Sequence, residues 1–277
     1  MNLTKEWRTF RAVFWRNLKL FTSYSAWIVA TLIWPIPLLA INIYSYRAFG
    51  TDASISSVIS RDYGFSNFAG MIIIGTVVYL LYNRLLWGAG ISLQSERWMG
   101  TIEALFVTPA SRMTVLFASG VSSLIEGAWW VGCIFVVSWM IFGVEPSITS
   151  WPAIILGVVS TMIALISVGV FFASFFVLTR AADQMASALQ APIRFFSGVA
   201  FPISALPQLL QFISYVLPVT YGIQAMRKAV LTGGNIASIT FEISSLYVFA
   251  IVLTVAGYFT LKALEKQAKR KGTLYTY

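Results

Sequence analysis

The chain has 277 residues, of which 58% are hydrophobic and 10% charged, and its mean hydropathy is +0.79. Soluble domains carry about a quarter charged residues, so this composition excludes a water-soluble globule and a disordered chain. The 19 Lys and Arg against 10 Asp and Glu give a net charge of +9, and there is no histidine. At about 20 residues per bilayer crossing, the length suits five to seven membrane helices joined by short loops.

The first 22 residues predict an amphipathic helix. Apolar side chains recur every three or four residues along one stripe: Leu3, Trp7, Phe10, Phe14, Leu18 and Phe21. Basic side chains occupy the other side: Lys5, Arg8, Arg16 and Lys19. The stretch lacks the continuous apolar core of a signal peptide. The pattern favours a helix in the membrane interface, with its basic side toward anionic headgroups. A plain soluble amphipathic helix is the alternative.

Six membrane spans follow from the apolar runs: 25–44, 68–92, 115–142, 151–178, 185–201 and 243–261. Pro35 and Pro37 interrupt the first span and are expected to kink it. Residues 45–66 are predicted to be a polar loop. We therefore expect an all-α integral membrane protein in which residues 1–277 form a single transmembrane domain.

Residues 202–234 differ from the spans. They are apolar, but Pro202, Pro207 and Pro218 divide them into pieces too short to cross a bilayer. Short apolar helices with proline breaks are typical of re-entrant or interfacial elements.

The positions of Lys and Arg predict the orientation. With a cytoplasmic N-terminus, 13 Lys and Arg fall in cytoplasmic segments, and four fall in outer ones: Arg47, Arg61, Arg227 and Lys228. The positive-inside rule then places both termini in the cytoplasm of a cell inner (plasma) membrane. We attribute the net charge to these loops and expect no nucleic-acid partner. The absence of a strong internal repeat disfavours a secondary transporter built from inverted halves.

The sequence contains none of the motifs Walker A, GxSxG or HExxH, and its single cysteine is Cys133. ATP hydrolysis, a catalytic site and a metal site are therefore not expected on this chain.

The informative polar segment is 93–110. Read as one helix, it carries an apolar stripe of Trp98, Ile102, Leu105 and Phe106. A second face carries Glu96, Gly100 and Glu103, and Pro109 fits the helix end. Two interpretations stay open at this point: a connector lying on the membrane, or a docking helix in which Gly100 lets a soluble partner approach closely.

Two runs of residues resemble a known family. The first resembles the signature after the second span of type-2 ABC exporter permeases: Glu96, Arg97, Gly100, Thr101, Glu103, Leu105, Thr108 and Pro109. The second resembles the end of the fifth span and the outer re-entrant helices of that family: Ser197, Gly198, Phe201, Pro202, Leu206, Pro207, Leu217, Pro218, Thr220, Tyr221, Arg227, Gly233 and Gly234.

The resemblance implies the transmembrane subunit of an ABC transporter, paired with a second permease copy (a homodimer, or a related permease) and with a separate nucleotide-binding ATPase. ATP and magnesium would bind that ATPase. Segment 93–110 would be the coupling helix, with Glu96, Arg97, Gly100, Thr101, Glu103 and Pro109 at the contact. An outer hinge would be formed by Gly198, Pro202, Pro207 and Pro218. The expected function is efflux of a hydrophobic or amphiphilic substrate of drug, lipid or glycan type. The alternative is an ion-coupled secondary transporter or channel.

Three charged residues fall inside predicted spans. Arg84 lies close to the inner interface, where its side chain is expected to snorkel toward water. Glu126 and Arg194 lie at matched depths near mid-membrane, where a charge faces a partner or a water-filled cavity. We favour a packing ion pair between Glu126 and Arg194. The second interpretation is a charged wall of the substrate path.

Overall fold

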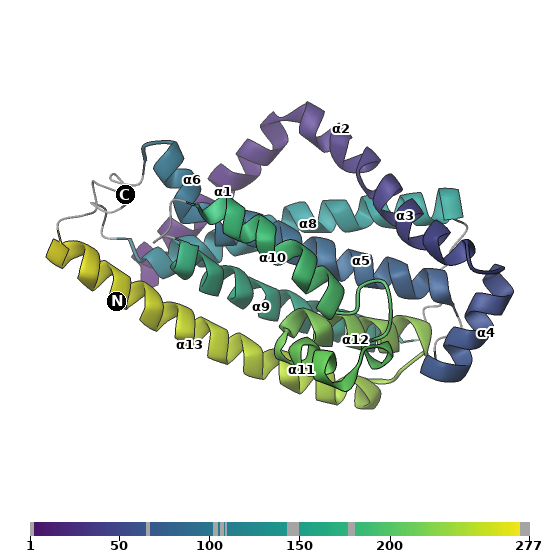
Figure 1. The fold of residues 1–277 in the computed structure, drawn as a ribbon. Coiled ribbons are helices and arrows are strands. Elements are labelled where there is room, and N and C mark those ends of the chain that lie inside the picture. The colour runs from purple at the N-terminus through teal and green to yellow at the C-terminus, as the bar shows by residue number, and fades with distance from the viewer. Residues whose placement is uncertain are drawn as a thin grey trace.

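The computed structural model describes residues 3–64, 67–101, 105, 108, 110–142, 150–176 and 181–271 (Figure 1). Every regular element in these ranges is helical, which confirms the predicted all-α fold. The α-helices in the first half are α1 (Leu3–Ser23), α2 (Ser25–Ile33), α3 (Pro35–Arg47), α4 (Asp52–Tyr63), α5 (Phe68–Leu85) and α6 (Ser92–Trp98). Those in the second half are α8 (Arg112–Phe142), α9 (Trp151–Phe176), α10 (Ala182–Phe196), α11 (Gln208–Val216), α12 (Pro218–Leu231) and α13 (Thr240–Lys271). Shorter elements are a π-helical turn, η1 (Leu86–Gly90), and two 3-10 turns, η2 (Ile203–Ala205) and η3 (Ile236–Ile239).

Four helical stretches are long and apolar enough to cross a membrane: Phe68–Gly90, Arg112–Ile141, Trp151–Phe176 and Ile236–Ala263. They coincide with the predicted second, third, fourth and sixth spans. A bent pair, α11 and α12, brings the number to five if the pair counts as one span. The predicted first span is divided into α2 and α3, and the predicted fifth span, 185–201, overlaps most of the 15-residue α10. These two crossings stay predictions.

Helix α5 forms the centre of the bundle, and nearly all of it is buried. It packs against α8, α9 and α12, while α13 runs along α9 and α1 lies along α8. Large apolar side chains of α5, such as Met71, Ile72 and Tyr82, are almost inaccessible. Helix α6 and the C-terminal end of α13 lie at one end of the bundle, and α4, α11 and α12 lie at the other (Figure 1).

The proline-rich region folds into short helices, as the sequence predicts. The chain leaves α10 through Gly198, whose φ of +72° favours glycine. Pro202 and Pro207 immediately precede η2 and α11, and Pro218 begins α12 at an angle of 93° to α11. The missing N–H and fixed φ of proline suit these positions. Whether this region re-enters the membrane stays a prediction.

The expected polar loop 45–66 is wrong in one respect, because residues 52–63 form helix α4. The capping residues of α4 explain why this polar segment is helical. The Thr51 hydroxyl accepts a hydrogen bond from the Ser54 N–H, Asp52 lies in the first turn, and Gly64 ends the helix at φ +75°. The composition of the segment indicates its polarity, whereas its helix depends on these start and stop signals.

Arg227 joins three parts of the bundle. Its side chain is 3% exposed and donates hydrogen bonds to the Met71 carbonyl (3.0 and 3.1 Å) and the Val199 carbonyl (2.8 Å). It therefore holds α12 to the start of α5 and to the turn after α10. Gly75 makes room for this arrangement, since a Cβ there would overlap the Val199 carbonyl and lie 2.8 Å from Arg227 Nη2.

Replacing Gly75 with alanine is therefore expected to destabilise the bundle. Overpacking of this kind costs about 1–3 kcal/mol, more than alanine gains in a helix. The control is Gly132→Ala on α8, because a Cβ at Gly132 meets nothing within 4 Å. Thermal unfolding of both variants in detergent measures the difference. Equal melting temperatures would show that the contact does not constrain α5.

Candidate functional site

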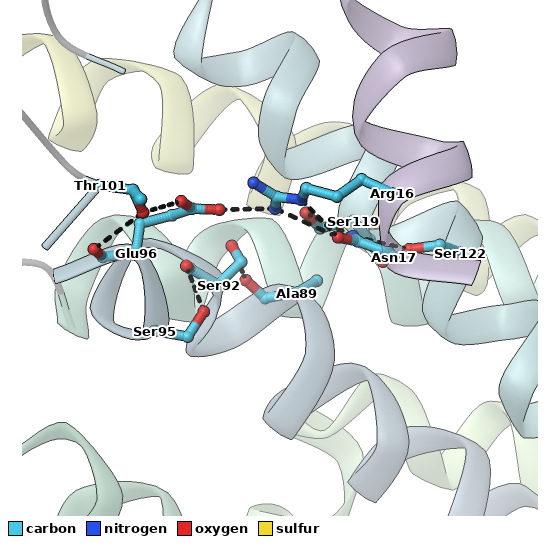
Figure 2. A network of polar contacts seen from close by, with 9 residues as sticks. All are labelled: Arg16, Asn17, Ala89, Ser92, Ser95, Glu96, Thr101, Ser119 and Ser122. Carbon is cyan, nitrogen blue, oxygen red and sulfur yellow. Dashed lines mark hydrogen bonds and ion pairs between the residues drawn. The ribbon is translucent and has the colours of Figure 1, made fainter. Parts of the chain in front are cut away.

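The candidate site lies where α1, α6 and α8 meet, at the end of the bundle that carries the polar segment 93–110 (Figures 1 and 2). Helix α1 contributes Arg16 and Asn17, α6 contributes Glu96, and α8 contributes Ser119 and Ser122. These residues lie far apart in the sequence and form one connected polar network.

Glu96 is the centre of this network. Its side chain is only 5% exposed, and its Oε1 lies 2.5 Å from Nη2 of Arg16, whose side chain is 44% exposed. The Thr101 hydroxyl donates to Glu96 Oε2 at 2.5 Å. A carboxylate buried in this way is costly without partners, and here both of its oxygens have one. The contact fixes helix α1 against α6, at the beginning of segment 93–110.

Helix α1 is also bonded to α8. The Asn17 amide donates to the hydroxyls of Ser122 (3.0 Å) and Ser119 (3.4 Å), and the Thr114 hydroxyl donates to Glu6 (2.6 Å). Arg16 in turn donates to Asn17 Oδ1 at 3.1 and 3.3 Å. The predicted amphipathic helix is thus present, and its inner face packs on the bundle. Three large side chains stay exposed on it: Trp7, Trp15 and Leu20. Its position in a membrane interface stays a prediction.

The expected single helix over 96–109 is wrong at its start. Helix α6 ends at Trp98, and Gly100 adopts φ +68°. The Thr101 N–H donates to the Glu96 carbonyl (2.9 Å), and the Gly100 N–H donates to the Arg97 carbonyl (3.1 Å). These two bonds form a Schellman motif, which closes a helix C-terminus around a left-handed glycine. Gly100 therefore stops helix α6, and the continuous helical spacing expected from Glu96 onward is interrupted at this residue.

Two large apolar side chains are exposed in the described part of this segment. Glu96 faces α1, while Trp98 and Met99 are more than half exposed and Gly100 and Thr101 lie at the surface beside them. Arg97 is half-buried. The predicted contact residues Glu103 and Pro109 lie outside the described residues.

The favoured Glu126–Arg194 ion pair is wrong. Glu126 on α8 instead pairs with Arg84 on α5, and both side chains are mostly buried. Arg84 therefore turns to a carboxylate in the bundle, where snorkelling toward water was expected. The guanidinium of Arg194 donates to Asn42 Oδ1 (3.2 Å) and lies 5.9 Å from the ring centre of Tyr79.

Helix packing explains the difference. Matched depth is necessary for an ion pair, but the two helices must also be neighbours. Helices α5 and α8 pack along each other, and Gly127 next to Glu126 lets Leu81 and Arg84 approach closely. Among the described residues, no group of three His, Cys, Asp or Glu side chains is placed to hold a metal ion.

Comparison with known proteins identifies the family. Residues 8–231 match the family described as ABC-2 type transporter, which is well over half of the chain. The chain belongs to this family. As an ABC-2 permease, it is a multi-pass membrane protein and the membrane subunit of an ABC transporter. The ABC-2 permease domain lacks an ATPase domain.

A shorter similarity involves one curated relative. Over 63 residues the chain is 40% identical to Nodulation protein J of Sinorhizobium fredii (strain NBRC 101917 / NGR234). The aligned stretch covers 22% of this permease and 23% of that protein. The similarity therefore spans about a quarter of the relative's length.

The permease sequence contained signals for some of this site and not for the rest. The helical pattern marks Glu96 and Gly100 and favours Gly100 as a close-approach residue, although glycine after a basic last turn is also a helix stop. The amphipathic pattern places Arg16 on the basic side of α1, toward lipid headgroups, whereas it pairs with Glu96. No pattern marked Asn17, Ser119 or Ser122, because small polar residues are common inside membrane helices.

Proposed function

We propose that this ABC-2 permease exports a hydrophobic or amphiphilic substrate from the cell, driven by a separate ATPase that docks beside α6. The observation that carries the proposal is the junction of Arg16, Glu96 and Thr101. It joins the exposed Trp98–Met99 end to helix α1, and α1 is bonded to the long helix α8. A displacement of the docking end is therefore passed to two further helices.

The proposed cycle uses a dimer of permease chains and a pair of ATPase subunits. ATP and magnesium bind the ATPases and draw them together, and the two docking ends follow. Because the Glu96 carboxylate is held on both sides, α1 moves with α6. The Asn17 contacts then carry the displacement to α8, whose Glu126 is paired with α5. The substrate path between the two permease copies opens outward as a result.

The proposed topology has six spans. Helices α2 and α3 form the first crossing with a break at Trp34, and α10 with the turn that follows it forms the fifth. Both termini and α6 lie in the cytoplasm of the cell inner membrane. Helix α4 and the bent pair α11–α12 lie outside. The arrangement of α6 and α4 at opposite ends of the bundle supports this assignment (Figure 1).

Reconstitution tests the function. The permease and an ATPase carrying a Walker A loop, encoded in an adjacent reading frame, are placed in proteoliposomes with fluorescent amphiphiles. We expect transport that requires ATP and is lost when the Walker A lysine of the ATPase is replaced. Transport that proceeds without the ATPase along an ion gradient would contradict the proposal and favour an ion-coupled transporter.

Thiol labelling tests the topology. In a Cys133→Ala background, Ser57→Cys on α4 and Ser238→Cys on η3 are expected to react with an impermeant reagent added to intact cells, since both positions are exposed. Thr22→Cys on α1 is the matched exposed position at the cytoplasmic side, and it is expected to react only after permeabilisation. The reverse pattern would invert the orientation.

A further inference from the structure

Helix α1 carries a row of exposed tryptophan and basic side chains, the α1 row. Its members, Trp7, Arg11, Trp15 and Lys19, lie four residues apart, and side chains at this spacing are neighbours on a helix surface. Trp7 is 65% exposed, Trp15 is 53% exposed, and the two basic side chains are exposed as well. The row alternates aromatic and basic groups over about 18 Å. The sequence pattern puts Trp7 and Lys19 on different sides of the helix, whereas the structure leaves both on its outer surface.

The two tryptophan rings are braced by phenylalanines of the same helix. Trp7 stacks on Phe10 with the ring centres 5.6 Å apart, and Trp15 meets Phe14 edge to face at 5.9 Å. Phe10 and Phe14 in turn stack on each other at 6.1 Å. The indoles are therefore packed on one side and open on the other. Tryptophans with an apolar body and an accessible N–H are typical of the level at which lipid headgroups meet the acyl chains.

The positive charges of the α1 row have no carboxylate partner. The side chains of Arg11 and Lys19 form neither an ion pair nor a hydrogen bond with any residue that the structure describes. Glu6 is the acidic residue of α1, and it accepts a hydrogen bond from Thr114 on α8. The described outer surface of α1 therefore carries positive charge without a counter-ion, and it fits an anionic partner.

The neighbouring helices indicate that this partner is a lipid. The contacts of α1 with α8 run from Thr114 to Ser122, near the beginning of α8, which is its cytoplasmic end in the proposed topology. Helix α2 follows α1 directly, contains no charged residue, and exposes Val29 (56%) and Ile33 (62%). Such an uncharged, apolar surface suits hydrocarbon and not water. The α1 row then lies where hydrocarbon gives way to headgroups, the place of helices that carry both tryptophan and basic residues.

We propose that the α1 row binds the headgroups of anionic phospholipids in the inner leaflet, an inference that rests on the topology proposed above. The guanidinium of Arg11 suits a phosphate, because its N–H groups can bond two oxygens at once. Lys19 adds a second positive charge. A zwitterionic headgroup gains less, since its own cation opposes both residues. The bound lipid anchors the helix whose Arg16 contacts Glu96 on α6.

Lipid binding to the purified permease tests the row without the ATPase. The full chain in detergent is titrated with phosphatidylglycerol, with phosphatidylcholine of the same acyl chains, and with glycerol phosphate, which has no acyl chain. Native mass spectrometry measures the bound fraction. Each basic residue near an anionic lipid surface strengthens binding about fivefold. With two such residues, we expect phosphatidylglycerol to bind about 25-fold more tightly than phosphatidylcholine, and glycerol phosphate not to saturate the site.

Matched variants locate the bound lipid. Arg11→Ala and Lys19→Ala are each expected to weaken phosphatidylglycerol binding about fivefold and to leave phosphatidylcholine binding unchanged. Arg61→Ala removes an exposed cation from α4, at the opposite end of the bundle, and is expected to change neither. Trp15→Ala is expected to weaken both lipids alike, because an indole at the interface contacts a lipid whatever its headgroup. Equal melting temperatures without added lipid check that the variants are folded.

Four results would overturn the lipid site: equal binding of the two lipids, binding of glycerol phosphate as tight as that of phosphatidylglycerol, unchanged phosphatidylglycerol binding by Arg11→Ala and Lys19→Ala, or an equal loss in Arg61→Ala. Binding in detergent does not depend on the orientation of the chain, so each of these results leaves the proposed topology and export standing. Labelling of Thr22→Cys in intact cells would instead invert the topology and contradict the inner leaflet, while selective binding would be retained.

Discussion

Replacing Glu126 with glutamine is expected to lower the free energy of unfolding by about 3–5 kcal/mol, the cost of leaving a buried charge without its partner. The side chain of Arg84 is 24% exposed and that of Glu126 is 6% exposed, so the uncompensated Arg84 has little access to water. Insertion scales for charges in membrane helices set a lower value of about 2.5–3.5 kcal/mol, because such side chains reorient toward water. Arg84→Gln is expected to cost a similar amount.

The double variant separates a pair from two independent residues. With both charges removed, no lone charge remains, and Arg84→Gln with Glu126→Gln is expected to recover most of the loss. The control is the exposed pair of Arg47 and Asp52, at 2.7 Å, for which single replacements are expected to cost less than about 1 kcal/mol. Yield and thermal unfolding in detergent provide the comparison. Losses at Arg84 and Glu126 that simply add would contradict the pairing.

Removal of Arg16 is expected to disconnect ATP hydrolysis from transport while the chain still inserts. Arg16→Ala leaves the Glu96 carboxylate buried with Thr101 as its remaining partner, so α6 loses its fixed contact with α1. Coupling free energies between sites are typically about 1–3 kcal/mol, or about 5–150-fold. We expect the ratio of substrate transported to ATP hydrolysed to decrease by about 5–150-fold.

The pair is asymmetric, which gives a second check. Glu96→Gln leaves Arg16 partly in water and keeps a hydrogen-bonding group for Thr101, so it is expected to be milder than Arg16→Ala. The control is Arg8→Ala, an exposed cation on the same helix. Rates of ATP hydrolysis and transport are measured in the same proteoliposomes. If Arg8→Ala and Arg16→Ala reduce the ratio of substrate transported to ATP hydrolysed equally, coupling depends on the overall positive charge of α1. The contact between Arg16 and Glu96 would then have no specific role.

Much of the fold follows from local patterns. The helical repeat from Leu3 to Phe21 becomes α1, and the proline at 218 starts α12 after a sharp bend. The caps of α4, Thr51 and Gly64, are equally local signals, although the polar composition of that segment alone favours a loop. Such signals depend only on neighbouring residues, so a sequence carries them in full.

The site depends on which helices become neighbours, and periodicity does not contain that information. Glu126 had two basic candidates, Arg84 and Arg194, and only the packing of α5 against α8 decides between them. The Arg16–Glu96 contact joins residues 80 positions apart. The continuous helix expected over 96–109 is interrupted for a local reason, since Gly100 ends α6 and turns Thr101 back to Glu96.

Site-specific photo-crosslinking tests most directly where the ATPase docks. Met99 at the end of α6 and Val58 on α4 are both 55% exposed, and they lie at opposite ends of the bundle. A benzoylphenylalanine residue is placed at one position or the other in a permease that is co-expressed with its ATPase and transports substrate. We expect a covalent adduct with the ATPase from position 99 and none from position 58. An adduct from position 58 and none from position 99 would contradict docking beside α6.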